Sequence, residues 1–168
     1  QTCALPICVG SFTAEVVRAG RTPRAQLISA KVAAPSAAVR KALQLGSGDK
    51  VHALQRLRFA DDEPLALETT YLPAALTPGL LDAPLEKSLW ALLRDHHSIV
   101  PATAQATLQL IVLDERTAEI LRVRSAVPGI LQVRITSDVD GRPFEYARDI
   151  YRADRTAFQF DATVHAPE

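Results

Sequence analysis

The sequence predicts an α+β domain in which a mostly antiparallel sheet of six or more strands is flanked by helices. Several segments alternate apolar and polar residues, as strands with one buried face do. The order strand, helix, hairpin occurs twice along the chain. About half of the 168 residues (48%) are hydrophobic, which is enough for one core of ordinary size. Together these observations predict a single domain without an internal boundary.

The first unit begins with an alternating strand at residues 25–32. A helix start at residues 35–36 is followed by apolar positions at helical spacing, and two glycines end this helix. Residues 51–59 and 65–72 alternate again on either side of an acidic turn that contains Pro64. This pattern predicts a strand, a helix and a β-hairpin.

The second unit repeats this order. It contains a strand at residues 106–113, a helix that Asp114 caps and that runs to Leu121, and two strands at residues 130–137 and 144–151. We interpret the repeat as a pseudo-duplication of one structural unit.

Between the units, residues 84–97 are predicted to form a helix that packs across the sheet, so that the helices gather on one face. The apolar stripe of this helix consists of Leu85, Leu89, Leu92 and Leu93. Residues 158–164 also alternate and predict a short strand at an edge of the sheet.

Two arginines are the first candidates for a binding site. Arg56 and Arg58 lie two residues apart on a predicted strand, so both side chains project to the same face, roughly 6–7 Å apart. Guanidinium groups bind phosphate or carboxylate oxygens through paired hydrogen bonds, so the two arginines could hold one anion. The alternative is that both pair with carboxylates on a solvated face.

Carboxylates and phenols lie on the returning strand of each hairpin. Glu68 and Tyr71 occupy the first of these strands, and Glu145, Tyr146 and Tyr151 occupy the second. Such groups hydrogen-bond to hydroxyls of the kind that sugars carry. The alternative for Tyr151 is an amphipathic residue that covers an edge of the sheet.

Hydroxyl groups elsewhere are weaker candidates. Ser88 could present its hydroxyl to an anion near a helix turn, and its alternative role is a helix cap. Ser11 and Thr13 could contribute in the same way, and Phe12 between them could cover the mouth of a pocket.

Neither a metal site nor a known catalytic motif is expected. Cys3 and Cys8 have no histidine near them, and the adjacent His96 and His97 cannot share a helical face. The sequence contains no phosphate-binding glycine loop, nucleophile elbow or zinc-hydrolase motif. We therefore expect a protein that is not an enzyme and needs no cofactor.

The charge balance argues against strong DNA binding by this chain alone. Acidic and basic residues number 19 each, so no net positive charge attracts a polyanion. No apolar run reaches the roughly 20 residues that span a bilayer, and the start does not look like a signal peptide. We expect a cytoplasmic protein without a membrane partner.

Residues 1–8 do not fit the predicted domain. They lack periodicity, and the first seven correspond to the in-frame translation of a common sequencing adapter. We interpret residues 1–8 as a sequencing artefact and place the domain at residues 9–165.

Two segments resemble the signatures of the UTRA domain, the effector module of the HutC group of GntR-type regulators. These segments are LQRLRFADDEPLALETTYLP at residues 54–73 and DGRPFEYARDIYRAD at residues 140–154. The resemblance extends from about residue 10 to about residue 161. It departs from the family at Trp90, where a tyrosine is common, and in the absence of the DNA-binding winged helix-turn-helix domain from this chain.

The resemblance implies a chorismate-lyase-like sheet that binds a small anionic metabolite, such as a phosphorylated sugar, and a homodimer that contacts DNA only through the missing domain. It implies that Arg56 and Arg58 hold the anion and that Ser88 supports it. The implied hydroxyl- or amino-reading residues are Glu68, Glu145 and Tyr151, and the implied covering residues are Ser11, Phe12 and Thr13. On this basis, replacing either arginine by alanine is expected to weaken binding without unfolding the domain.

Two alternatives remain at this point. One is a stand-alone enzyme of the chorismate-lyase type, which uses a similar sheet with arginine and glutamate around a dicarboxylate. The other is a dimerisation module without a working pocket. Neither the effector, the operator nor the sign of regulation follows from the residues.

Overall fold

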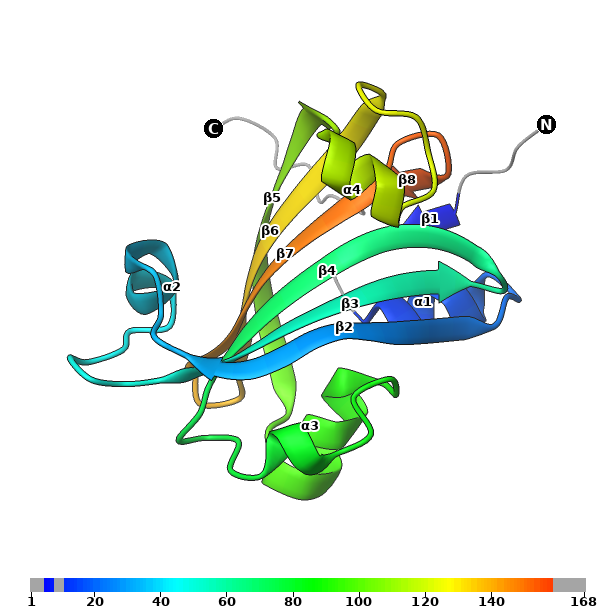
Figure 1. Ribbon diagram of the computed structural model, residues 1–168. Helices are drawn as coiled ribbons and strands as arrows, with labels where there is room; N and C mark the ends of the chain where they lie inside the picture. The colour runs from blue at the N-terminus through cyan, green and yellow to red at the C-terminus, as the bar shows by residue number, and fades with distance from the viewer. Residues whose placement is uncertain (1–4, 8–10, 159–168) are drawn as a thin grey trace, which may run out of the picture.

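The computed structural model describes residues 5–7 and 11–158 and contains a six-stranded antiparallel sheet (Figure 1). Its strands are β2 (Pro23–Ala33), β3 (Val51–Ala60), β4 (Glu63–Pro73), β5 (Pro101–Val112), β6 (Pro128–Asp138) and β7 (Pro143–Arg152). Four α-helices are described, α1 (Phe12–Arg18), α2 (Ala37–Ala42), α3 (Leu89–His97) and α4 (Glu115–Ile120), with a short 3-10 helix, η1 (Leu80–Asp82). In space the strands follow the order β2, β3, β4, β7, β6, β5.

This order confirms the two repeated units. The first consists of β2, α2, β3 and β4, and the second of β5, α4, β6 and β7. The last strands of the two units, β4 and β7, pair with each other at the centre of the sheet. Each half of the sheet is therefore one unit, and the returning strands of both hairpins lie side by side.

The helix starts follow from capping residues in the sequence. The side chain of Ser36 accepts a hydrogen bond from the Val39 backbone N–H at 3.3 Å, and that of Asp114 accepts one from Thr117 at 2.7 Å. Each cap satisfies a backbone donor that the first helical turn leaves free. The cap predicted at Asp114 is thus confirmed.

Helices α1 and α3 cover one face of the sheet. From α1, Phe12 and Val16 pack on Ala66 and Tyr151. Helix α3 contributes to a larger apolar cluster, which contains Leu54, Leu72, Leu80, Leu85, Leu89, Leu92, Leu93, Ile99 and Phe144.

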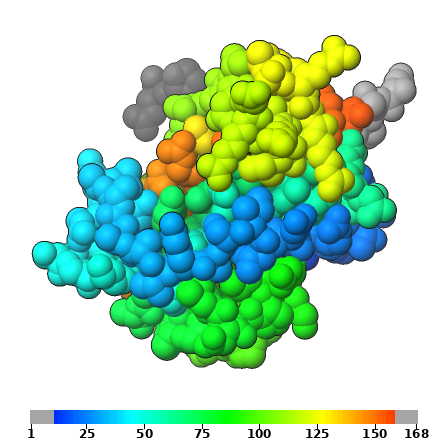
Figure 2. All heavy atoms as spheres, in the orientation of Figure 1, coloured from blue at the N-terminus to red at the C-terminus, as the bar shows by residue number. Residues whose placement is uncertain are grey.

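Helices α2 and α4 cover the opposite face. Val39 in α2 packs near Val51 and Tyr146, and Ala118 in α4 packs near Leu57. The space-filling view shows α3 and α4 on opposite sides of β2 (Figure 2). The expectation that the helices gather on one face was therefore wrong. Both faces of the central strands carry apolar residues, and burying both requires helices on each side.

Three boundaries also differ from those predicted. The helix predicted for residues 84–97 begins only at Leu89, because Ser88 caps it and residues 84–87 form a turn. Strand β5 begins at Pro101, five residues before the predicted start. Of the strand predicted at residues 158–164, only Phe158 is described, at the end of β8 (Thr156–Phe158), and the rest lies outside the described residues.

A second, small sheet joins the two ends of the described chain. Strand β1 (Leu5–Ile7) pairs in parallel with β8. The first strand lies inside the segment interpreted as an artefact, while Cys3 and Cys8 lie outside the described residues. No helix in the described ranges has the length and hydropathy needed to cross a membrane.

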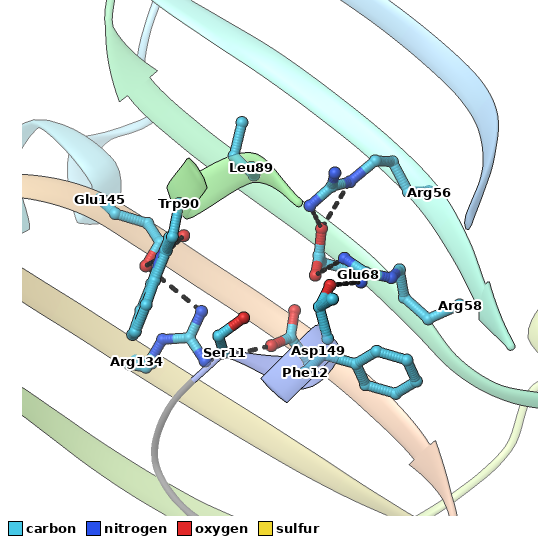
Figure 3. Close-up of a pocket in the computed structure, with 11 residues that line it drawn as sticks. Ser11, Phe12, Arg56, Arg58, Glu68, Leu89, Trp90, Arg134, Glu145 and Asp149 are labelled. Atoms are coloured by element: carbon cyan, nitrogen blue, oxygen red, sulfur yellow. Dashed lines mark hydrogen bonds and ion pairs between the residues drawn. The ribbon is translucent and has the colours of Figure 1, made fainter. Parts of the chain in front are cut away.

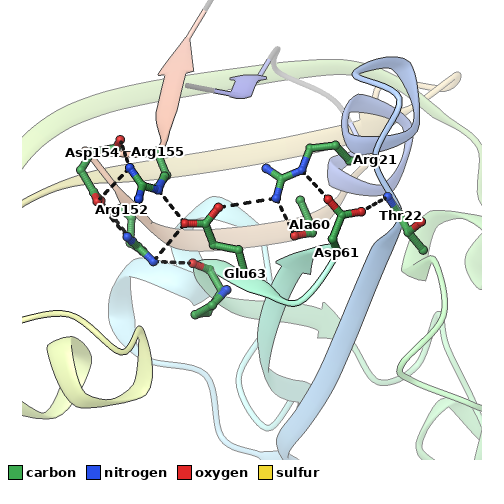
Figure 4. A network of polar contacts seen from close by, with 9 residues as sticks. Arg21, Thr22, Ala60, Asp61, Glu63, Arg152, Asp154 and Arg155 are labelled. Carbon is green, nitrogen blue, oxygen red and sulfur yellow. Dashed lines mark hydrogen bonds and ion pairs between the residues drawn. The ribbon is translucent and has the colours of Figure 1, made fainter. Parts of the chain in front are cut away.

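An ion-pair network holds the turn between β3 and β4 (Figure 4). Arg21 pairs with Asp61 at 2.8 Å, and Arg155 pairs with Glu63 at 2.6 Å. Glu63 also lies 3.7 Å from Arg152 on β7. Partly exposed pairs of this kind contribute about 0–1 kcal/mol each, so the network mainly orients the turn against the loop after α1 and the end of β7.

Candidate functional site

Three ionisable side chains lie in a row across the centre of the sheet. Arg56 on β3 is opposite Glu68 on β4, and Glu68 is opposite Asp149 on β7. Directly paired residues of antiparallel strands project to the same face. All three therefore point to the face that α1 and α3 cover (Figure 3).

Arg56 ties the sheet to the turn before α3. Its Nε donates to Oε1 of Glu68 at 2.7 Å, and its Nη2 donates to the same oxygen. Its Nη1 donates to the backbone carbonyls of Leu85 and Lys87, at 2.9 and 3.1 Å. The side chain is only 1% exposed, and each of its three nitrogens has a partner. Arg56 is therefore as much a structural residue as a candidate for binding.

Arg58 is less completely paired. Its Nη1 donates to Oε2 of Glu68 at 3.1 Å, and its Nη2 donates to Oγ1 of Thr13 at 3.0 Å. The guanidinium carbon lies 4.5 Å from the centre of the Phe12 ring. The buried Nε has no hydrogen-bond partner among the residues that the structure describes. Burial lowers the pKa of Arg58, although the charge of Glu68 opposes this effect.

Glu68 is the anion that the two arginines already hold. Burial would raise the pKa of this carboxyl group, but the charges of Arg56 and Arg58 outweigh burial and lower the pKa below its ordinary value. The two arginines therefore already hold a carboxylate of the chain itself.

A second cluster surrounds Glu145, next to the first. Both oxygens of Glu145 lie 3.2 Å from the indole Nε1 of Trp90, which donates to them. Arg134 Nη2 donates to Oε2 of Glu145 at 3.2 Å, and the hydroxyl of Thr136 donates to the same oxygen at 2.6 Å. Helix α3 and strands β6 and β7 are thereby joined at one carboxylate.

Asp149 lies between the two clusters, and its carboxyl group differs from that of Glu68 in its pKa. Burial raises the pKa of its carboxyl group to about 8, with Glu68 and Glu145 adding to the rise and Arg134 opposing it. Asp149 Oδ2 is 3.9 Å from Nη1 of Arg134, and Oδ1 has no hydrogen-bond partner within the described part of the chain. Asp149 is therefore mostly protonated at neutral pH and can donate as well as accept a hydrogen bond.

The cluster encloses little empty space, but a groove leads to it. The cavity among these side chains has a volume of about 20 Å³, close to the space that one water molecule needs. Ser11, Thr13 and Trp90 line this cavity and also line a groove of about 410 Å³ between α1 and α3. A metabolite can therefore enter only if side chains at the inner end of the groove move.

Most of the predicted site residues meet in this cavity. Its lining includes Ser11, Phe12, Thr13, Arg56, Arg58, Glu68 and Glu145.

Two predicted residues do not line the cavity. Tyr151 is 2% exposed and packs edge-on against Phe158, with the ring centres 5.2 Å apart, because its position on β7 places it beneath α1. Ser88 accepts a hydrogen bond from the Ala91 backbone N–H at 3.4 Å, so it caps α3, and it lines the outer groove.

Sequence reasoning did not assign Arg134, Asp149 or Trp90 to the site, although it noted Trp90 as a departure from the family and Asp149 on the strand face of Glu145. One signal was present for the first two. In the hairpin of β6 and β7, most even-numbered residues of β6 are polar, and the odd-numbered residues of β7 include Glu145 and Asp149. Pairing those two faces would have brought Arg134 and Asp149 together with Glu145.

The charges of the described site residues are of the kind that favour a polar anion. Three arginines outnumber Glu68 and Glu145, the two carboxylates with which they form close ion pairs, so one positive charge is in excess. Buried guanidinium groups favour phosphate or carboxylate. Glu145 and the protonated Asp149 offer an acceptor and a donor to hydroxyl or amino groups nearby.

Known proteins resemble this chain in sequence. Residues 18–157 match the UTRA domain family. The chain is 28% identical over 148 residues to the HTH-type transcriptional repressor NagR of Bacillus subtilis, covering 88% of this chain and 61% of that protein. It is 30% identical to the HTH-type transcriptional repressor PhnF of Mycolicibacterium smegmatis, covering 96% of this chain and 65% of PhnF. The chain thus spans less than two thirds of these relatives.

Solved structures give the same result. The crystal structure of the effector domain of PhnF from Mycobacterium smegmatis has a TM-score of 0.88 and 29% identity, covering 98% of this chain and all of that one. A GntR-family transcriptional regulator from Enterococcus faecalis V583 has a TM-score of 0.76 and 26% identity, covering 82% of this chain and 99% of that one. The matched residues, the repeated hairpins and the shared fold show that this chain belongs to the UTRA domain family, the effector domains of GntR-type transcriptional regulators.

Proposed function

We propose that this chain senses a small anionic metabolite for a DNA-binding transcriptional regulator, and that it is not an enzyme. The observation that carries the proposal is the buried pair of Arg56 and Arg58, which holds an internal carboxylate at the inner end of a groove. An incoming phosphate or carboxylate can replace that carboxylate, because it offers the same charge and hydrogen-bond geometry.

The second cluster would determine which anion binds. Glu145 and Asp149 lie on the same strand face as the arginine cluster and offer hydrogen bonds to hydroxyl or amino groups. A ligand that carries an anionic group at one end and hydroxyls at the other would use both clusters. We therefore propose a phosphorylated sugar or a sugar acid as the effector class.

Binding would act on DNA through a change in geometry. Thr13 in α1 bonds to Arg58, and Trp90 in α3 bonds to Glu145, so both helices touch the proposed site. A ligand that binds better to one arrangement of these helices shifts the population toward it. In the intact dimeric regulator, we propose that this shift changes the spacing of winged helix-turn-helix domains on an operator.

Arg58 provides the direct test of the anion site. We expect thermal-shift screening against phosphosugars, sugar acids, urocanate and chorismate to identify a ligand that raises the melting temperature. Replacing Arg58 by alanine should weaken that ligand about tenfold or more, because charge-assisted hydrogen bonds are lost. Calorimetry measures the affinity of both proteins.

Arg148→Ala is the matched control, because Arg148 is exposed on β7 and projects to the other face of the sheet. Its affinity should equal that of the unaltered protein. Equal affinity in Arg58→Ala would remove the anion site from the proposal, and release of pyruvate from chorismate would favour the enzyme instead.

Glu68→Gln tests whether Glu68 competes with the ligand. An amide keeps the shape of the side chain but removes the charge that occupies Arg56 and Arg58. We expect the affinity for inorganic phosphate or the identified anion to rise about tenfold, the equivalent of about 1.4 kcal/mol. A fall in affinity, measured by calorimetry, would mean that Glu68 instead reads hydroxyl or amino groups of the ligand.

A further inference from the structure

Gln132 is a buried amide whose polar atoms have no partner. It lies in the middle of β6 and is 0% exposed, yet neither Oε1 nor Nε2 forms a hydrogen bond within the described part of the chain. Such an amide has lost its hydrogen bonds to water without replacing them, which normally destabilises a folded protein. Buried polar groups without partners are rare, so the one at Gln132 requires a physical reason.

Asp149 is the neighbour of Gln132 across the strands and also has an unpaired atom. The two residues lie directly opposite each other on β6 and β7, so their side chains project to the same face of the sheet. Oδ1 of Asp149 has no hydrogen-bond partner among the residues that the structure describes. Because Cβ atoms of directly opposite residues are about 4.5–5.5 Å apart, the unpaired groups lie close together.

The two glutamates on the same face have partners within the chain. Both oxygens of Glu68 accept hydrogen bonds from arginines, and both oxygens of Glu145 accept hydrogen bonds from neighbouring side chains. On β5, Leu108 lies opposite Gln132 and offers no polar side-chain atom. The fold therefore satisfies the adjacent carboxylates but leaves unpaired atoms on both Gln132 and Asp149.

This pair of residues adjoins the cavity of the proposed anion site. Asp149 lines that cavity together with Arg58 and Glu145 (Figure 3). Gln132 lies beside Asp149 on the neighbouring strand. A ligand that moves the side chains at the inner end of the groove would therefore reach Asp149, with Gln132 next to it.

The pair carries little charge at neutral pH. Gln132 is an amide, and the carboxyl group of Asp149 is mostly protonated, because burial raises its pKa to about 8. Each of the two groups can both donate and accept a hydrogen bond. A hydroxyl or an amide also does both and matches the pair, whereas an ammonium group or a second carboxylate would meet no opposite charge on either residue.

We propose that Gln132 and Asp149 form a subsite that binds an uncharged hydrogen-bonding group of the effector, a hydroxyl or an amide, away from its anionic group. This inference rests on the proposed function and adds Gln132 as a residue that determines specificity. The two side chains gain their missing hydrogen bonds only when the ligand is bound. The subsite therefore selects anions that carry such a group over anions that do not.

Gln132→Met tests the subsite without any ligand. Methionine keeps the unbranched shape of the side chain and removes its amide. We expect the melting temperature of the ligand-free protein to rise by about 2–4 °C, because an unpaired buried amide is replaced by an apolar group. Gln26→Met is the matched control, because Gln26 is exposed on β2 and lies opposite Leu57, on the other face of the sheet. A lower melting temperature in Gln132→Met would mean that Gln132 stabilises the fold, and would overturn the proposal.

Calorimetry with phosphate probes tests the subsite in the bound state. Inorganic phosphate is expected to contact only the arginines, so Gln132→Met should bind it as the unaltered protein does. We expect the unaltered protein to bind glucose 6-phosphate or its 2-acetamido analogue about tenfold more tightly than inorganic phosphate, because these add hydroxyl or amide groups. Gln132→Met should lose most of this gain, and Gln26→Met should keep it.

Asp149→Asn tests whether the subsite is uncharged. Asparagine keeps an uncharged donor and acceptor, so this variant should bind the tighter probe within about threefold of the unaltered protein at pH 7. A loss of about tenfold or more would mean that the ligand requires an ionised carboxylate, and the uncharged subsite would then be wrong.

The results also separate this inference from the proposed function. No binding of any phosphate probe to the unaltered protein would remove the anion site, and the subsite with it. Binding of inorganic phosphate without a gain for either sugar phosphate, or with a gain that Gln132→Met keeps, would overturn the subsite alone.

Discussion

Replacing Arg56 by alanine is expected to lower the free energy of unfolding by about 3–5 kcal/mol, because it leaves the buried carboxylate of Glu68 without its main partner. The same change removes the hydrogen bonds that hold the carbonyls of Leu85 and Lys87 before α3. Urea unfolding followed by circular dichroism measures the loss. The sequence alone predicts that Arg56→Ala leaves the domain folded, and the contacts of Arg56 add that the variant should be much less stable.

Arg58 is the matched comparison on the same strand. Arg58→Ala leaves Glu68 paired with Arg56, so the loss of stability should be clearly smaller than for Arg56→Ala. Replacing Arg56, Arg58 and Glu68 together by leucine should recover much of the stability lost in Arg56→Ala, because all three charges of these buried ion pairs are then removed. A loss below about 1 kcal/mol in Arg56→Ala would show that Arg56 is not a structural tie.

Asp149→Asn is expected to make the domain more stable than the unaltered protein as the pH rises from 5 to 8. Burial raises the pKa of Asp149 to about 8 in the folded protein, well above its ordinary value of 3.8. Folding therefore favours the protonated form, and the stability linked to it is present below about pH 4 and is lost as the pH rises toward 8. In that interval, a rise of one pH unit lowers the free energy of unfolding of the unaltered protein by at most about 1.4 kcal/mol relative to that of Asp149→Asn.

The free energy of unfolding of Asp149→Asn is compared with that of the unaltered protein at each pH, because other titrating groups change the stability of both proteins in the opposite direction. The pKa of His52 is lowered, first by burial and then by the charge of His97, so its contribution increases with pH near its ordinary value. The pKa of Glu68 is also lowered, so its contribution is lost only as the pH falls well below its ordinary value of 4.5. Denaturant midpoints of both proteins at several pH values would isolate Asp149. A difference that does not change with pH would mean that Asp149 is ionised throughout.

The alternation of residues determined much of this fold without any coordinates. Period-two segments and capping residues located both strand, helix and hairpin units, because strand faces and helix caps depend on residues close in sequence. The same local reasoning placed Arg56 and Arg58 on one face of β3. It also identified the family signatures around the two hairpins, which lie within matched residues 18–157.

Only the tertiary structure decided how these pieces combine. The pairing of β4 with β7 brings Glu68 beside Asp149, 81 residues away, and turns Tyr151 into a buried neighbour of α1. The helices cover both faces because both faces of the central strands carry apolar residues that must be buried, which no single segment reveals. Whether Arg56 is structural and Asp149 is protonated depends on burial and on charges from distant strands, and the sequence pattern does not contain these quantities.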